Sequence, residues 1–96
     1  MSVNVGAVET WDTGCTVREQ ALKVLEEAAE AFAAARNYAE FRSHLPEGAG
    51  NQRMHVLAEC ADVITATCNL LSMLGVEDAT EIMADCARRQ RERGGL

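Results

Sequence analysis

The sequence has few aromatic residues and almost no proline. Aromatic side chains make up 4% of its 96 residues, and Pro46 is the only proline. No segment alternates apolar and polar residues in the way of a half-buried strand, and no repeat or low-complexity tract is present. Alanine is abundant, which favours helices and lets them approach closely. These features predict one all-α domain, since a chain of this length forms a single domain.

The four cysteines form no C-x-x-C pair, so a zinc or redox motif is not indicated. Cys60 and Cys68 would lie about 12 Å apart along one helix, which is too far for a disulfide. We interpret these two, Cys15 and Cys86 as reduced packing residues, as in a cytosolic protein.

The chain also lacks an excess of positive charge and a leader segment. Its formal net charge is −6, which argues against nucleic acid as a partner. The N-terminus has neither the basic nor the apolar segment of a secretory signal. The longest nearly uncharged run, residues 63–76, is too short to span a bilayer. We therefore expect a cytoplasmic protein that does not insert into membranes.

Three helices are predicted. Residues 1–12 have no helical period and form an irregular arm, with Trp11 as a possible anchor, ahead of an all-α domain at 13–96. Thr13 or Thr16 can cap a first helix, and Thr16 with Glu19 three residues on is a capping-box pattern; the helix runs to about Ser43. Residues 44–50 form a loop, because proline and glycines interrupt any element there.

A second helix is expected from about Asn51 to Leu74, ending at Gly75, and a third from after Val76 to about Arg93. Two long helices joined by a short loop form an antiparallel hairpin. Two hairpins make a four-helix bundle, so the simplest way to complete the core is a homodimer or a dimer of dimers.

The second helix carries two acids in an otherwise apolar stretch from 54 to 74. Such a helix is normally buried, so we expect Glu59 and Asp62 in or near the core. They lie about 60° apart on one face, and Asn69 extends the same polar stripe. His55 precedes Glu59 by four residues and is interpreted as a helix-surface histidine.

The first helix offers a matching pair, Glu27 and Glu30, with Glu26 beside them and Lys23 one turn earlier. If the helices pack as a hairpin, Glu27 and Glu30 can meet the two acids of the second helix at one point. Clustered carboxylates repel one another unless a hard cation neutralises them, and oxygen ligands select Mg²⁺, Mn²⁺ or Ca²⁺ over zinc. Mg²⁺ also binds substrate phosphates, which suggests phosphate-bond chemistry. Acid pairs at this spacing are also common on solvated helix faces.

The C-terminal residues 88–96 carry four arginines and one glutamate. One interpretation is that these arginines complement the dipole of the third helix. The other is that one or two of them fold over the acidic site and hold phosphates, for which the planar guanidinium group is well suited.

These motifs resemble a known family. Leu25-Glu-Glu-Ala-Ala-Glu30 followed by Glu59-Cys-Ala-Asp62 is similar to the E-E-x-x-E … E-x-x-D signature of the MazG-like nucleotide pyrophosphohydrolases, in the all-α NTP pyrophosphatase superfamily. The stretch from Asp62 to Asn69 and the ending from Arg89 to Gly94 are similar to further family segments. The likeness covers roughly residues 16–94.

The resemblance implies that Glu27, Glu30, Glu59 and Asp62 bind Mg²⁺, with Mn²⁺ as a possible substitute. It implies hydrolysis of a nucleoside triphosphate to the monophosphate and pyrophosphate, as in nucleotide-pool housekeeping. Glu26 or Glu27 would then orient the attacking water, and the candidate substrate contacts are Lys23, Asn69, Arg89 and Arg93.

Two departures from the family pattern concern the length of the hairpin loop and one substrate contact in the basic tail. The gap of 28 residues between Glu30 and Glu59 is long, and Gln90 stands where asparagine is usual. Two alternative functions stay open: a phosphoribosyl-ATP pyrophosphohydrolase of histidine biosynthesis, and a non-catalytic helical dimerisation or regulatory module.

Overall fold

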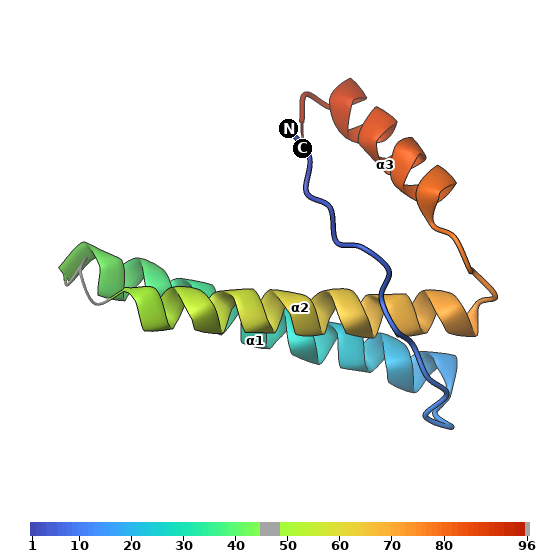
Figure 1. Cartoon of the computed structure of the whole chain (residues 1–96), viewed down its shortest axis with the longest axis horizontal. Coiled ribbons are helices and arrows are strands. Elements are labelled where there is room, and N and C mark those ends of the chain that lie inside the picture. Colours follow the sequence, from blue (N-terminus) through green and yellow to red (C-terminus); the bar gives the residue numbers. More distant parts are fainter. Residues whose placement is uncertain (45–48, 96) are drawn as a thin grey trace.

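The computed structural model describes residues 1–44 and 49–95 (Figure 1). The described chain contains three helices, α1 (Val17–His44), α2 (Gly50–Met73) and α3 (Thr80–Glu92), and no strand. The all-α prediction is therefore confirmed. Each helix boundary except the start of α3 lies within a residue of the predicted one, and residues 45–48 of the predicted loop lie outside the described part.

The N-terminus of α1 is fixed by the predicted capping box. The Thr16 Oγ1 atom accepts the Glu19 backbone N–H at 3.1 Å, and Glu19 Oε1 accepts the Thr16 N–H at 2.9 Å. Two backbone donors that a helix start leaves unpaired are thus satisfied. The hydrogen bonds from Thr16 hold the pKa of Glu19 below its ordinary value.

The C-terminus of α2 is closed by Gly75, which adopts φ of +83°. Its N–H bonds the Ser72 carbonyl at 3.0 Å, and the Val76 N–H bonds the Leu71 carbonyl at 3.0 Å. This pair of bonds is the Schellman motif, and it favours glycine because a side chain is strained at positive φ. The sequence predicted this helix end correctly.

The helices α1 and α2 pack against each other as a hairpin, whereas α3 points away from it (Figure 1). The α3 helix has no buried residue. Its first turn is preceded by Asp78, whose carboxylate accepts the Thr80 N–H at 2.9 Å and the Thr80 hydroxyl at 2.6 Å. These bonds lower the pKa of Asp78 and place the start of α3 at Thr80.

A single chain buries little apolar surface. Among the described residues, the buried apolar side chains are those of Ala34, Ala49 and Ala66. We expected α2 to be buried on nearly all sides, and this is wrong for one chain, because α1 covers one face of α2 and leaves residues such as Leu57 exposed. The radius of gyration is 15.8 Å, larger than the roughly 12–13 Å of a compact domain of this length.

By length and composition α2 is also the one helix of the described chain that could cross a membrane, a property it shares with core helices of soluble proteins. It carries Glu59 and Asp62 near its middle, and charged side chains are costly in a bilayer.

The irregular arm was predicted over residues 1–12, and the structure extends the non-helical segment to Thr16; this N-terminal arm runs across the hairpin (Figure 1). The Trp11 backbone N–H donates to Asn69 Oδ1 of α2 at 3.0 Å, and the Thr10 hydroxyl bonds the Ser72 hydroxyl at 3.4 Å. The arm is thus attached to α2 although it forms no helix.

Candidate metal centre

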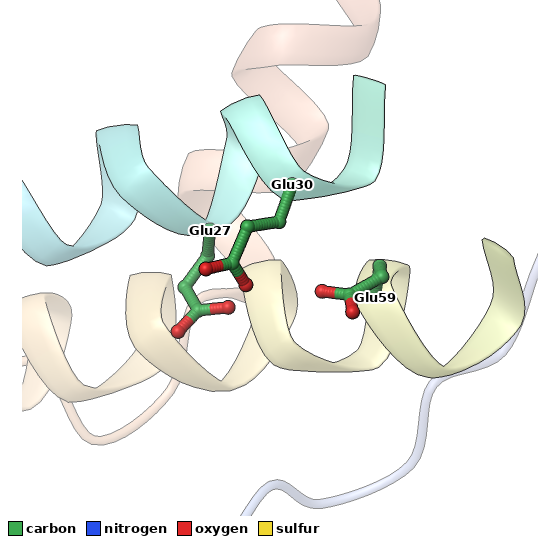
Figure 2. A group of neighbouring side chains, drawn as sticks. All are labelled: Glu27, Glu30 and Glu59. Atoms are coloured by element: carbon green, nitrogen blue, oxygen red, sulfur yellow. The ribbon is translucent and has the colours of Figure 1, made fainter. Parts of the chain in front are cut away.

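Three carboxylates converge between the two hairpin helices. Glu27 and Glu30 project from α1 and Glu59 from α2, and one oxygen of each lies within 4.8 Å of the others (Figure 2). The spacing of three residues places Glu27 and Glu30 on the same side of α1. Antiparallel packing of the hairpin then brings Glu59 opposite them.

Two of these side chains are largely withdrawn from solvent. The side chain of Glu27 is 14% exposed and that of Glu59 is 16% exposed. Glu30 is exposed. The cluster therefore has a closed side within the hairpin and an open side at Glu30.

Each of these two half-buried glutamates, Glu27 and Glu59, has one paired oxygen. Glu27 Oε1 lies 3.4 Å from Lys23 Nζ, and Glu59 Oε1 lies 3.1 Å from His55 Nε2. Both partners stand one turn earlier on the same helix. The exposed position of His55 agrees with its interpretation as a surface histidine, but its contact orients a carboxylate of the cluster.

The second oxygen of each of these half-buried glutamates has no hydrogen-bond partner. Glu27 Oε2 and Glu59 Oε2 are fully buried and accept no hydrogen bond. A buried polar oxygen left without a partner is unfavourable, and an unpaired carboxylate more so. A cation bound at the cluster would give both atoms a partner.

Mutual repulsion perturbs the third member. The negative charge of Glu27, followed by partial burial and by the proximity of Glu59, raises the pKa of Glu30 above its ordinary value. A carboxylate that resists ionisation beside two others indicates uncompensated negative charge. A hard divalent cation would remove this repulsion, and oxygen-only donors suit Mg²⁺ or Mn²⁺.

Asp62 is not part of this cluster, although we expected four acids to meet and Asp62 to lie in or near the core. It is exposed, and its side chain lines a neighbouring cavity together with Glu27 and Lys23. The spacing of three residues puts Asp62 on the same face of α2 as Glu59, but the acids of α1 meet this face at Glu59, and Asp62, about one turn further along, borders the cavity. Glu26 is exposed on α1 and likewise stands outside the three converging side chains.

The predicted substrate contact Asn69 is 5% exposed and anchors the N-terminal arm. Its Oδ1 accepts the Trp11 N–H, and its Nδ2 donates to the Thr65 carbonyl at 3.0 Å. Asn69 and Lys23 also line the cavity beside Glu27. Both therefore lie next to the acidic cluster, and Asn69 has a structural task that the sequence pattern did not indicate.

The arginines predicted to contact substrate lie on α3, away from the cluster (Figure 1). Arg89 Nε donates to Asp85 Oδ2 at 3.0 Å, and Arg93 is the C-terminal cap residue of α3. Within one chain, the structure does not bring Arg89 or Arg93 to the acids. Their placement in the last turn matches the alternative interpretation, complementation of the helix dipole.

The cavity has a volume of about 510 Å³ and lies between the arm and the hairpin. Its walls include Trp11 of the arm, Gln20 of α1 and Asn69 of α2. Sequence reasoning proposed Trp11 as an anchor but missed Gln20, whose Nε2 donates to the Ala66 carbonyl at 3.0 Å and whose side chain is 6% exposed. A polar residue at an inward position of α1 was the available signal.

No protein-family model matches the chain, and comparison with curated proteins and with solved structures found no similar protein. The functional assignment therefore depends on the residues and their geometry.

Proposed function

We propose that the protein is a Mg²⁺-dependent nucleoside triphosphate pyrophosphohydrolase that converts a (deoxy)nucleoside triphosphate into its monophosphate and pyrophosphate. The observation that carries this proposal is the pair of buried, unpartnered oxygens, Glu27 Oε2 and Glu59 Oε2, in a three-carboxylate cluster. The motif resemblance described above supplies the reaction class, and a cytoplasmic role in nucleotide-pool housekeeping follows from it.

The residues present fit a hard cation. Glu27, Glu30 and Glu59 would hold it, and Asp62, at the cavity wall, would join them through a coordinated water or a small rearrangement. When bound, Mg²⁺ supplies neutralisation of the phosphate charge and lowers the pKa of a coordinated water. Mn²⁺ has the same ligand preference and is expected to substitute.

The side chains have separate tasks in the reaction. Glu27 is the better placed of the two predicted bases, because it belongs to the cluster and also lines the cavity, whereas Glu26 is exposed outside both. Glu27 would accept the proton of the attacking water. Lys23, held 3.4 Å from Glu27, offers a positive charge to a phosphate oxygen. Arg89 and Arg93 would contribute only through closure of α3 or assembly with another chain.

We further propose that the working unit is a homodimer, or a dimer of dimers, with a four-helix-bundle core. Apolar side chains are exposed on α1 (Leu22, Leu25, Phe32) and on α2 (Met54, Leu57, Ile64). Bare apolar faces of this extent are rare on monomeric proteins. A second hairpin would cover them and supply the core that one chain lacks. Light scattering coupled to gel filtration should give at least twice the 10.4 kDa chain mass.

The decisive experiment is a substrate screen. The purified chain is incubated with each common ribo- and deoxyribonucleoside triphosphate and with phosphoribosyl-ATP, in Mg²⁺, and pyrophosphate release is measured. Release from at least one compound, abolished by EDTA and restored by Mg²⁺ or Mn²⁺, is the expected result. Exclusive activity on phosphoribosyl-ATP would instead identify the histidine-pathway enzyme.

The bare apolar faces also favour a second candidate, a non-catalytic helical dimerisation or regulatory module. Calorimetric titration with Mg²⁺ separates the two functions. Heat of binding at millimolar Mg²⁺ that disappears in Glu59→Gln supports the hydrolase, while a dimer that binds no metal and releases no pyrophosphate supports the module.

A further inference from the structure

The cavity of about 510 Å³ is distinct from the acidic cluster but continuous with it. Glu27 belongs to both, since it is one of the three converging carboxylates and also lines the cavity. The volume lies in the range of about 300–1,000 Å³ that is usual for small-molecule sites. A ligand in the cavity would therefore extend directly toward the carboxylates.

The N-terminal arm forms one wall of this cavity through Trp11. The arm is held there by polar groups of the hairpin. Asn69 Oδ1 accepts the Trp11 N–H at 3.0 Å, and Gln20 Oε1 accepts a bond from the Cys15 thiol at 3.4 Å. Because both Asn69 and Gln20 are buried, the position of the arm against the hairpin is part of the fold.

The charged residues that line the cavity determine which part of a nucleotide it would bind. Apart from Lys23, the charged residues of the walls are the acids Glu19, Glu27 and Asp62, so a phosphate group is favoured only beside Lys23 and the cluster that would hold the cation. A neutral, planar group meets no repulsion from these acids. Trp11 is the only tryptophan of the chain, is 59% exposed, and offers an aromatic surface of the kind on which nucleobases stack.

We infer that this cavity holds the base and sugar of the nucleotide, with the Trp11 indole stacking on the base and the phosphates directed toward Glu27. The N-terminal arm is then a substrate-binding element, and Trp11 is a binding residue that determines how well a base is held. This inference rests on the proposed function for the class of ligand, but it concerns binding and can be measured without turnover.

The single tryptophan makes a direct test available. Intrinsic fluorescence of the full chain is titrated, in Mg²⁺, with the four common nucleoside 5′-monophosphates and with ribose 5-phosphate, which lacks only the base. A saturable fluorescence change is expected with at least one nucleotide and not with ribose 5-phosphate. No change with any nucleotide, or an equal change with the base-free sugar phosphate, would overturn the inference.

Variants of the arm provide the second measurement, with affinity for the best monophosphate taken by calorimetry. Trp11→Ala should weaken binding by about 5- to 150-fold, the range for loss of one base–aromatic stack. Trp11→Phe should lose less, because a ring remains. Val5→Ala is the matched control, since Val5 is an exposed arm residue outside the cavity lining. Unchanged affinity in Trp11→Ala would contradict the stacking role.

The two proposals fail in different ways. Hydrolysis of a triphosphate with no tryptophan response would leave the hydrolase standing and overturn the cavity assignment. A base-dependent tryptophan response without any pyrophosphate release would support the cavity as a nucleoside site and refute the catalytic function.

Discussion

The hairpin and α3 both carry many charged side chains. In α3 the charges form pairs of opposite sign, whereas in the hairpin three acids cluster. In α3, Arg88 bonds Asp85 at 2.6 Å and Glu92 at 2.9 Å, and Arg89 bonds Asp85 at 3.0 Å. All of these side chains are about half exposed or more. The hydrogen bonds from Arg88 and Arg89 lower the pKa of Asp85. In the hairpin, the carboxylates of Glu27, Glu30 and Glu59 face one another, and the charge of Glu27 is the main cause of the raised pKa of Glu30.

The difference lies in the sequence separation of the partners. The α3 charges are complementary and stand three or four residues apart, so one helix satisfies them without tertiary contacts. Glu27 and Glu30 also stand three residues apart on one helix, but they carry like charges, and packing of the hairpin adds the like charge of Glu59 from α2. Repulsion among like charges does not favour such an arrangement, and the proposed cation would offset it. Four experiments sharpen or break this contrast.

The largest effect is expected from removing one acid of the cluster. Glu59→Gln keeps the shape of the side chain and its helix but removes a charge that holds the metal. We expect pyrophosphate release to fall by about 100-fold or more, since a catalytic metal contributes several kcal/mol. Glu81→Gln in the first turn of α3 is the control and should keep full activity. Equal activity of the two variants would show that the cluster is not catalytic.

A smaller effect concerns assembly. Phe32 is 67% exposed on α1 and Met83 is 61% exposed on α3. If the hairpin forms the dimer core, Phe32→Ser should raise the dissociation constant of the dimer by about 30-fold, the effect of losing an interface hot spot. Met83→Ser should have little effect. Analytical ultracentrifugation measures both, and equal weakening would mean that α3 also belongs to the interface.

Helix starts offer a third comparison. Thr16→Ala removes the cap of α1 and should lower the free energy of unfolding by about 1 kcal/mol, because α1 is half of the cooperative hairpin. Asp78→Ala removes the equivalent hydrogen bonds at α3, which buries no residue. We expect the second change to fray α3 without shifting the main urea transition. A shift of similar size would show that α3 unfolds together with the hairpin.

The smallest effect is a pH dependence at Glu30. Its pKa in the folded chain is raised above the ordinary value of 4.5, so the folded state binds the proton more tightly than the unfolded state. The ionised group thus costs stability, and this cost appears as pH rises from about 4.5 through the raised pKa. Because Glu30 is exposed, solvent screening keeps the effect modest.

Glu30→Gln isolates this contribution. Without metal, the variant should be slightly more stable than the native chain at pH 7 and equally stable below pH 4. Saturating Mg²⁺ should reverse the difference at pH 7, because the native chain then gains a ligand. Thermal unfolding of both chains at the two pH values, with EDTA or Mg²⁺, gives the comparison. A stability difference that does not change with pH would remove charge repulsion as its cause.

Much of the secondary structure was predictable because its signals are local. Thr16 with Glu19 marked the start of α1, and Gly75 marked the end of α2, each through hydrogen bonds within a few residues. The facing of Glu27 and Glu59 was also expected from helical spacing. The burial of α2 was overestimated, since an apolar helix shows that a partner surface is required but not whether the same chain supplies it.

Other features of the site had no local signal. Glu59 and Asp62 share a helix face by their spacing, so which of them meets Glu27 and Glu30 depends on how α1 lies against α2. The role of Asn69 depends on the path of the N-terminal arm, which returns from a distant part of the sequence to give it the Trp11 N–H.

The sequence by itself determined the three helices, the cap of α1, the end of α2 and the acids available to bind a cation, because propensity, capping and charge act over a few residues. The tertiary structure decided which acids meet, that Asp62 faces the cavity, and that Trp11 forms its wall. Those outcomes depend on the relative placement of α1, α2 and the arm, which is set by packing between segments far apart in the chain.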